Sequence, residues 1–202
     1  MTTEPPPPDV IDAQLRVLID AGEIDRATAD ALRTFGPELI GWLSSVLPSE
    51  ADAHEAFSWM SEELWKSLRR WDGRCSMRTW CYMLARHATV RIRGQPRRQH
   101  ELLVSQVPSI AHAVTHVWNT SRANAAQVQD VYGEIRRMLD DEDQTLLVLR
   151  VDRDLAWRDI AIVLLGEGAG DAEVTKKAAT LRKQFERVKE RLRTLASEKL
   201  QD

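Results

Sequence analysis

The chain has 202 residues, of which 43% are hydrophobic, and a formal net charge of −3 at pH 7. This length allows one good core or two small ones, and the two cysteines, Cys75 and Cys81, exclude a disulfide framework and fit a reducing cytosol. The N-terminus lacks the features of a signal peptide, and no apolar run approaches the roughly 20 residues of a membrane-spanning helix. We therefore expect a cytoplasmic protein without membrane contact.

The N-terminal segment is expected to be a tail followed by a helical extension. Residues 1–8 include four consecutive prolines, which favour an extended chain over a helix. Helical periodicity then covers residues 9–34 with a pause at Gly22, as in a small helical hairpin. A further helix is expected from about residue 37 to 47.

The next predicted helix begins with a capping pattern and has two distinct faces. Ser49 followed by Asp52 resembles a capping box, and Pro48 ends the preceding helix. The expected core side carries Phe57, Met60, Leu64, Leu68 and Trp71. The other side carries Asp52, Glu55, Trp59, Glu62 and Lys66. Trp59 is outside the core phase, so it either covers the N-terminal hairpin or anchors an interface.

A glycine-bearing loop and a two-faced helix occupy residues 70–88. Apolar residues at three- and four-residue steps predict one buried stripe: Met77, Trp80, Cys81, Leu84, Ala85, Ala88 and Ile92. Another face carries Arg78, Tyr82, Arg86 and Arg93. Residues 66–99 contain ten Lys or Arg and one acid, Asp72. Such a basic face is either a solvated surface or a nucleic-acid contact.

Residues 99–125 are expected to form a linker between two domains, because serine, proline and asparagine interrupt the helical pattern. The segment is not purely polar, since it contains Val114, Val117 and Trp118. It therefore either docks in a groove of a partner or rests as a loose connector on its own domains.

The C-terminal half has the pattern of a helix-turn-helix. Three short helices are expected in succession, over residues 126–139, 145–151 and 155–165. Cap residues mark their ends: Asp141 and Gln144 before the second, Asp154 before the third and Gly166 after it.

A long helix is expected over residues 171–196. Its apolar residues form an unbroken core stripe: Val174, Ala178, Leu181, Phe185, Val188, Leu192 and Leu195. Polar and basic side chains gather on other faces of its N-terminal half, which is the part of a recognition helix that enters the major groove: Lys176, Lys177, Thr180, Arg182, Lys183 and Arg187. Three later cations, Lys189, Arg191 and Arg193, are explained by the helix dipole alone.

The two halves resemble regions two and four of the sigma-70 family, specifically its short extracytoplasmic-function (ECF) type. Over about residues 35–98 the resemblance lies in Asp52-Ala53-His54-Glu55, Leu64-Trp65 and the ungapped run from Arg70 to Arg86. Later, the run from Thr180 to Arg193 follows the family pattern position by position. The chain departs from the family at His54, at Ser58 and over residues 167–179, where the family has a short turn.

The resemblance implies an all-α, two-domain initiation factor, with a region-two-like domain over 35–98 and a region-four-like domain over 126–200. The non-template −10 strand would be held by Arg74, Cys75, Ser76, Met77, Arg78, Tyr82 and Arg86. The −35 element would face Lys176, Lys177, Thr180, Arg182, Lys183, Glu186 and Arg187. Trp80 lies on the apolar stripe, so Tyr82 is the aromatic residue expected to contact DNA.

The implied partners are core RNA polymerase and promoter DNA, and many members of the family are also held by an anti-sigma factor. The β′ clamp helices of the polymerase would contact Asp52, Glu55, Trp59 and Glu62, and its β flap would contact the second domain. The linker would thread the polymerase active-site cleft. Outside this complex the chain is expected to be a monomer.

No pattern in the chain predicts an enzyme, a cofactor or a metal site. His112 and His116 share a helical face, but no nearby cysteine completes a zinc set. Gly166, Gly168 and Gly170 follow a helix, not a strand, and so form a turn. Two rival functions remain: a dimeric helix-turn-helix regulator that acts without polymerase, and a degenerate sigma-like adaptor that binds polymerase or an antagonist without initiating transcription.

Overall fold

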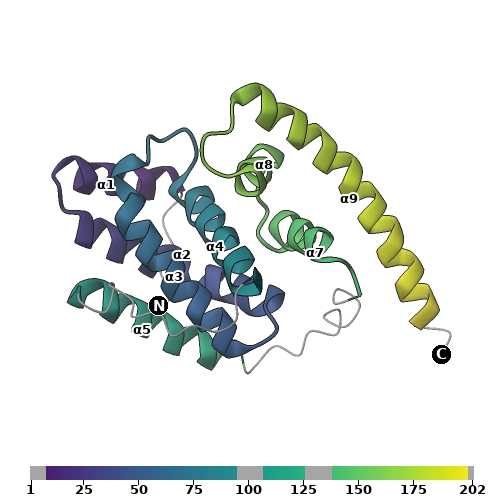
Figure 1. The fold of residues 1–202 in the computed structure, drawn as a ribbon, viewed down its shortest axis with the longest axis horizontal. Helices are drawn as coiled ribbons and strands as arrows, with labels where there is room; N and C mark the ends of the chain where they lie inside the picture. The colour runs from purple at the N-terminus through teal and green to yellow at the C-terminus, as the bar shows by residue number, and fades with distance from the viewer. Residues whose placement is uncertain (1–7, 95–106, 126–137, 200–202) are drawn as a thin grey trace. The chain divides into compact units, whose positions relative to one another are not determined.

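The structure of the chain is a computed structural model that describes residues 8–94, 107–125 and 138–199. The regular elements within these ranges are all helical and include no strand (Figure 1), which confirms the predicted all-α class. The contacts divide the chain into two compact units, Met1–Gln127 and Val128–Asp202.

The described part of the first unit consists of five α-helices and a 3₁₀ turn. They are α1 (Pro8–Asp20), α2 (Ile24–Val46), α3 (Glu50–Ser67), the 3₁₀ turn (Leu68–Arg70), α4 (Met77–Gly94) and α5 (Pro108–Ala125). Pro8, expected in the tail, begins α1, because the missing N–H of proline is harmless at the first helical position. The predicted pause is a turn at Gly22 (φ +77°). Ser49 caps α3 as predicted, since its hydroxyl accepts from the Asp52 amide at 3.1 Å.

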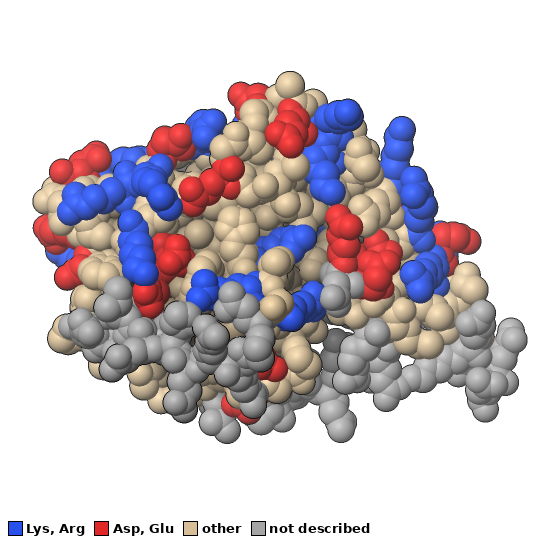
Figure 2. Space-filling model, viewed as in Figure 1, with Lys and Arg blue, Asp and Glu red and all other residues tan. Residues whose placement is uncertain are grey.

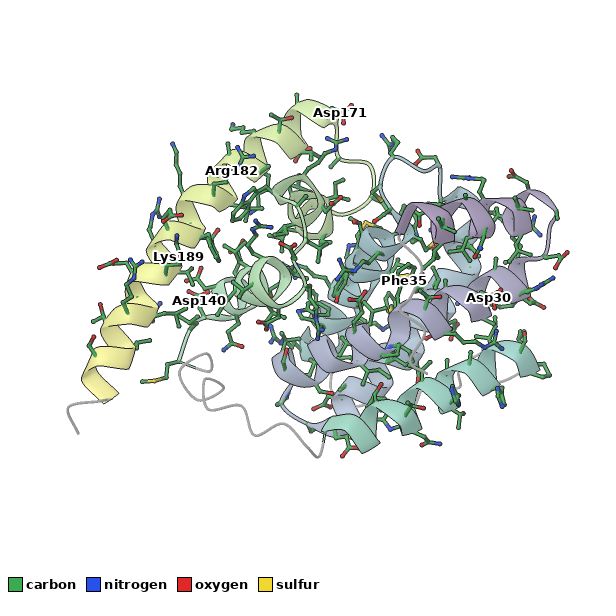
Figure 3. All side chains as sticks on the ribbon, turned by 180° about the vertical axis from the view of Figure 1, so that it is seen from behind. Asp30, Phe35, Asp140, Asp171, Arg182 and Lys189 are labelled. Carbon is green, nitrogen blue, oxygen red and sulfur yellow. The ribbon has the colours of Figure 1, made fainter. Side chains whose placement is uncertain are left out.

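Helix α2 continues through Pro37, although the sequence predicted a break between residues 34 and 37. A proline inside a helix removes one backbone hydrogen bond and usually kinks or ends the helix. Here Pro37 is exposed, while Phe35 (marked in Figure 3) and Leu39 on the same helix are buried. Burial of one continuous apolar face therefore outweighs the missing hydrogen bond.

Helix α2 contacts α1, α3, α4 and α5. These contacts bury the two stripes predicted from the sequence: Phe57, Met60, Leu64, Leu68 and Trp71 in and after α3, and Met77, Trp80, Cys81, Leu84, Ala85 and Ala88 in α4. Ile92, expected at the end of the second stripe, is half-buried.

The expected linker is in part a helix of the first unit. Helix α5 packs on α2 and α3 and buries five apolar residues: Ile110, Ala113, Val114, Val117 and Trp118. Gly36 of α2 allows this close approach, because a Cβ at that position would lie 2.6 Å from Val117 Cγ1. Trp118 also meets His54 of α3 edge-on, with ring centroids 4.8 Å apart. The first unit therefore extends well past residue 98, and α5 is firmly packed on it.

The described part of the second unit contains α7 (Asp141–Leu147), a π-helical turn (Val148–Asp152), α8 (Trp157–Leu165) and α9 (Asp171–Lys199). Their core includes Leu139, Leu147 and Val188, with Phe185, Leu192 and Leu195 packed against it. Most of the helix expected over 126–139 lies outside the described residues. The remaining order, two short helices followed by a turn and a long helix, agrees with the prediction.

Two of the expected helix caps in this unit are wrong. The Asp140 carboxylate, not that of Asp141, caps α7 by accepting from the Asp143 amide at 2.9 Å. Asp154 has a positive φ of 49° and lies before the true N-cap of α8, Ala156. Gly166 ends α8 with φ +88°, as predicted.

We predict that Gly36→Ala destabilises the first unit by about 1–3 kcal/mol, because the added methyl group overlaps Val117 and forces α5 away from α2. Urea unfolding measures the change. The matched control is Gly94→Ala, where no atom lies within 4 Å of the new Cβ and stability should not fall. A Gly36→Ala protein as stable as the wild type would show that this contact does not seat α5.

Candidate nucleic-acid interfaces

The loop before α4 (residues 71–76) is built around the buried side chain of Trp71. The Trp71 indole N–H donates to the Cys75 carbonyl at 2.9 Å, which joins the two ends of the loop. Between them, the Arg74 amide donates to the Asp72 carboxylate at 3.0 Å, and Gly73 has φ +80°. These are usual components of a tight turn. The loop therefore has a defined shape, with its tip residues 72–74 exposed.

The end of this loop caps α4. The Ser76 hydroxyl accepts from the Thr79 amide at 3.1 Å. The Met77 amide, in the first turn of α4, donates to the Asp12 carboxylate of α1 at 3.1 Å. The two bonds satisfy amides that a helix N-terminus leaves without intrahelical partners, and the carboxylate also favours the helix dipole. The role of Asp12 was not predictable from the sequence, because no local pattern connects this residue to Met77, which lies 65 positions later.

Two titratable groups near the loop have shifted pKa values. The hydrogen bond from the Arg74 amide lowers the pKa of Asp72, so this contact is present at neutral pH and is lost as the pH falls below the usual carboxyl range. Burial raises the pKa of the Cys81 thiol, which therefore stays protonated at neutral pH. Cys75 is only partly buried, so the two thiols differ in their exposure to reagents.

The structure divides the residues expected at the −10 strand. Three of them belong to the loop and are exposed or half-buried: Arg74, Cys75 and Ser76. Met77 and Tyr82 are fully buried, so their expected roles as DNA contacts are wrong. Tyr82 packs edge-on against Trp42 of α2, with ring centroids 5.8 Å apart. The prediction assigned one buried face to α4, whereas this helix packs against both α2 and α3. Arg86 is half-buried on the same helix.

The arginine face of α4 is bound to the rest of its own unit. Arg78 forms two hydrogen bonds, both 2.8 Å, with the Glu38 carboxylate of α2, and this pairing raises the pKa of its guanidinium. Arg91 lies over the Trp59 ring, 5.3 Å from its centre. Arg93 donates to a backbone carbonyl of α2 at 2.5 Å. All three arginines connect helices, and two of them, Arg78 and Arg93, belong to the basic face that the spacing predicted.

The residues expected to contact polymerase lie on α3 in different environments. Asp52 and Glu55 are half-buried. Glu62 is buried and hydrogen-bonded to Lys66, which contradicts its expected place on an open face. The described ring contact of Trp59 is with Arg91 of α4, a neighbour that neither interpretation of this tryptophan named.

Exposed cations follow the N-terminal half of α9. Figure 3 marks Asp171, Arg182 and Lys189 along this helix. Four are exposed and pair with no carboxylate in the part of the chain that the structure describes: Lys176, Arg182, Lys183 and Arg187. Lys177 differs, because it pairs with Glu142 of α7 at 3.3 Å. Glu186 pairs with Lys189 at 2.8 Å. In Figure 2 a run of blue atoms follows α9 at the right, with red atoms beside it, and blue and red are interspersed over α1 at the left.

Most of these cations lie opposite the core of the second unit. At about 100° per residue, one stripe of α9 carries four residues: Lys176, Thr180, Lys183 and Arg187. The buried residues Val174, Leu181 and Val188 lie on the opposite side. Arg182 lies on the flank between the two stripes. The stretch that departs from the sigma pattern is largely helical, because α9 begins at Asp171, and this continuity brings Lys176 into line with the later cations.

Comparison with known proteins identifies no relative, since no protein-family model, curated protein or solved structure matches the chain. Among the described residues, no group of three or more His, Cys, Asp or Glu could hold a metal ion. His112 and His116 are exposed on α5 with parallel rings, 6.3 Å between centroids. No helix in the described ranges is long and apolar enough to cross a membrane.

We predict that a thiol reagent at pH 8 modifies Cys75 rapidly and Cys81 only after unfolding, because burial both shields Cys81 and keeps it protonated. Absorbance of the released chromophore, in native buffer and in urea, counts the reactive thiols. Cys75→Ser should remove the fast phase and Cys81→Ala should leave it intact. Rapid modification of both thiols in the native protein would contradict the burial of α4.

Proposed function

We propose that the chain is a transcription initiation factor of the ECF sigma type, in which α9 contacts duplex DNA and the 71–76 loop holds a single strand. One observation carries the proposal. The second helix of a helix-turn-helix, formed by α8 and α9, presents a stripe of cations that no described carboxylate neutralises. Cations in that place meet phosphates and base edges when such a helix enters the major groove.

The side chains of α9 suit different parts of the −35 duplex. Arg182 and Arg187 can each donate two hydrogen bonds to one guanine edge, while Lys176 and Lys183 are suited to phosphates. Lys177 is the least available cation of the expected set, because it pairs with Glu142 of α7.

The loop before α4 is the proposed site for the non-template −10 strand. Its exposed tip carries the Gly73 backbone and the Arg74 guanidinium, whose Nε donates to the Asp72 carboxylate at 2.8 Å. Ser76 follows, immediately before α4. A base taken out of the stack costs a few kcal/mol, and a loop that is already ordered loses less of that binding energy to its own ordering. The buried Tyr82 has no part in this proposal.

Core RNA polymerase would supply the catalysis, in the cytoplasm. Its β′ clamp helices would dock on α3 beside Asp52 and Glu55, and its β flap on the second unit. Neither DNA-binding surface needs high affinity by itself, because attachment to polymerase raises the effective concentration of both. An anti-sigma factor is a further proposed partner, and the free chain is proposed to be a monomer.

A second candidate is a sigma-like adaptor that binds polymerase or an antagonist without opening DNA. The specific observation in its favour is the fate of the basic face of α4. Arg78 is engaged by Glu38, and Tyr82 is buried against Trp42, so fewer groups remain for a strand than the sequence suggested.

Transcription in vitro separates these candidates. The purified chain and core polymerase from its source would transcribe a pool of genomic fragments, and the transcript 5′ ends would be mapped. New starts that share −35 and −10 sequences support an initiation factor. Stable binding to polymerase without new starts supports the adaptor. If neither is seen, a regulator that acts without polymerase becomes the leading candidate, and its dimerisation would be measured next.

We predict that Arg182→Ala and Arg187→Ala each weaken −35 duplex binding by about 1–3 kcal/mol, as expected for loss of an arginine contact to a base. Lys183→Ala should weaken binding to all sequences and lower the salt dependence by about one ion. Fluorescence anisotropy at several salt concentrations measures both effects. Arg193→Ala is the matched control on the same helix, because Arg193 is paired with Glu190 and should contribute little.

We predict that Arg74→Ala slows promoter opening more than it weakens duplex binding, because Arg74 lies at the exposed tip of the proposed strand-binding loop. Permanganate reactivity of −10 thymines measures opening. Arg69→Ala, at an exposed arginine of the neighbouring 3₁₀ turn, is the control. If Arg74→Ala reduced promoter opening and duplex binding equally, the loop would not act specifically in strand opening.

A further inference from the structure

Helix α1 contacts both ends of the 71–76 loop through two side chains one helical turn apart. Arg16 donates to the Trp71 carbonyl at 2.8 Å, and its guanidinium carbon lies 4.3 Å from the centre of the Trp71 ring. Asp12 accepts from the Met77 amide, immediately after the loop, at 3.1 Å. Residues four apart share one side of a helix, so a single side of α1 contacts the loop where it starts and where it ends.

The tip of the loop also approaches Arg16. A Cβ on Gly73 would lie 3.0 Å from the Arg16 terminal nitrogen, so the guanidinium passes close to the exposed turn. The same planar group thus hydrogen-bonds a carbonyl, stacks on a ring and lies against a glycine. Lysine cannot reproduce this combination, because it lacks the planar, forked head of arginine.

The loop is held in place partly by its own residues and partly by the contacts from α1. Contacts within the loop include the Trp71 indole hydrogen bond to Cys75 and the bonds of the Arg74 amide and guanidinium to the Asp72 carboxylate, and the tip is exposed. A loop that becomes ordered only on binding loses affinity to the entropy of ordering, whereas a loop that is already fixed does not. The two contacts from α1 therefore lie where they affect the affinity of the loop for a ligand.

We propose that α1 holds the 71–76 loop in the shape that receives the non-template strand, with Asp12 and Arg16 as positioning residues. This inference rests on the proposed function and adds a means of regulation to it. A partner that draws α1 away from the loop would reduce strand capture without touching Arg74 or α9. The N-terminal helical extension is, in this proposal, a support of the strand-binding loop.

The test compares Arg16→Ala and Asp12→Ala with the conservative variants Arg16→Lys and Asp12→Asn. Arg33→Ala is the matched control, because Arg33 is an exposed arginine that pairs with Asp30 on α2. The first measurement is the rate at which a thiol reagent modifies Cys75, with Cys81 as an internal report on folding of the unit. The second, with core polymerase, is permanganate reactivity of −10 thymines, alongside affinity for polymerase and for −35 duplex.

We expect Arg16→Ala to raise the Cys75 rate at least about fivefold, the change that loss of a hydrogen bond and a cation–π contact implies, while Cys81 stays protected. The rate of promoter opening should fall by a similar factor. The affinities for polymerase and for −35 duplex should stay within about twofold of the wild-type values. Asp12→Asn keeps an acceptor oxygen and should restore most of what Asp12→Ala loses. Arg33→Ala should change neither measurement.

Unchanged Cys75 reactivity in both alanine variants would overturn the claim that α1 holds the loop. Faster Cys75 modification with unchanged opening would overturn the positioning role. If Cys81 also becomes reactive in an alanine variant, the first unit of that variant has unfolded. The Cys75 rate and promoter opening are then compared in the milder Arg16→Lys and Asp12→Asn variants. A wild-type chain that opens no promoter would instead refute the proposed function, and the positioning role with it, while the Cys75 rates would still report whether α1 holds the loop.

Discussion

The first unit depends on one constraint, which is that α2 must be covered by helices that differ widely in sequence position. Four helices contact it, and small residues set how closely they approach, as Gly36 does for Val117 of α5. Because α4 must pack on both α2 and α3, it buries more than one face, and Tyr82 is inside the unit for that reason. The shape of the loop before α4 follows in turn, since α4 is fixed by these contacts at one end of the loop and Trp71 is buried at the other.

Local patterns predicted the elements of this fold well, and long-range contacts explain where they failed. The apolar stripe of α9 and the Ser49 cap of α3 depend on residues within one or two helical turns, so both can be predicted from the local sequence. The continuity of α2 through Pro37 depends on an apolar face buried by other helices. The ion pair between Arg78 and Glu38 joins residues that are 40 positions apart, and no periodic pattern in the sequence predicts it. The candidate site was therefore predictable on α9 and only partly predictable around α4.

The two basic helices show that formal charge and available charge are different quantities. The segment from Lys66 to Gln99 has the greater excess of cations in the sequence, yet several of its arginines engage carboxylates, rings or carbonyls of their own unit. Helix α9 has a smaller excess, but the cations of its outward stripe, Lys176, Lys183 and Arg187, pair with no described carboxylate. Charge held by a neighbouring carboxylate contributes less to the attraction of a polyanion than charge facing water. Pairing, more than composition, therefore decides which helix offers a basic surface.

The contact between Gly36 and Val117 also affects the order in which the unit is assembled during synthesis. Of the described helices of the first unit, α5 is the last to leave the ribosome and α2 is among the first. The apolar side of α2 that α5 covers therefore stays uncovered while the intervening residues, 47–107, are made, a matter of seconds at typical elongation rates. During that interval the nascent chain presents a surface suited to a chaperone, and closure of α5 removes it.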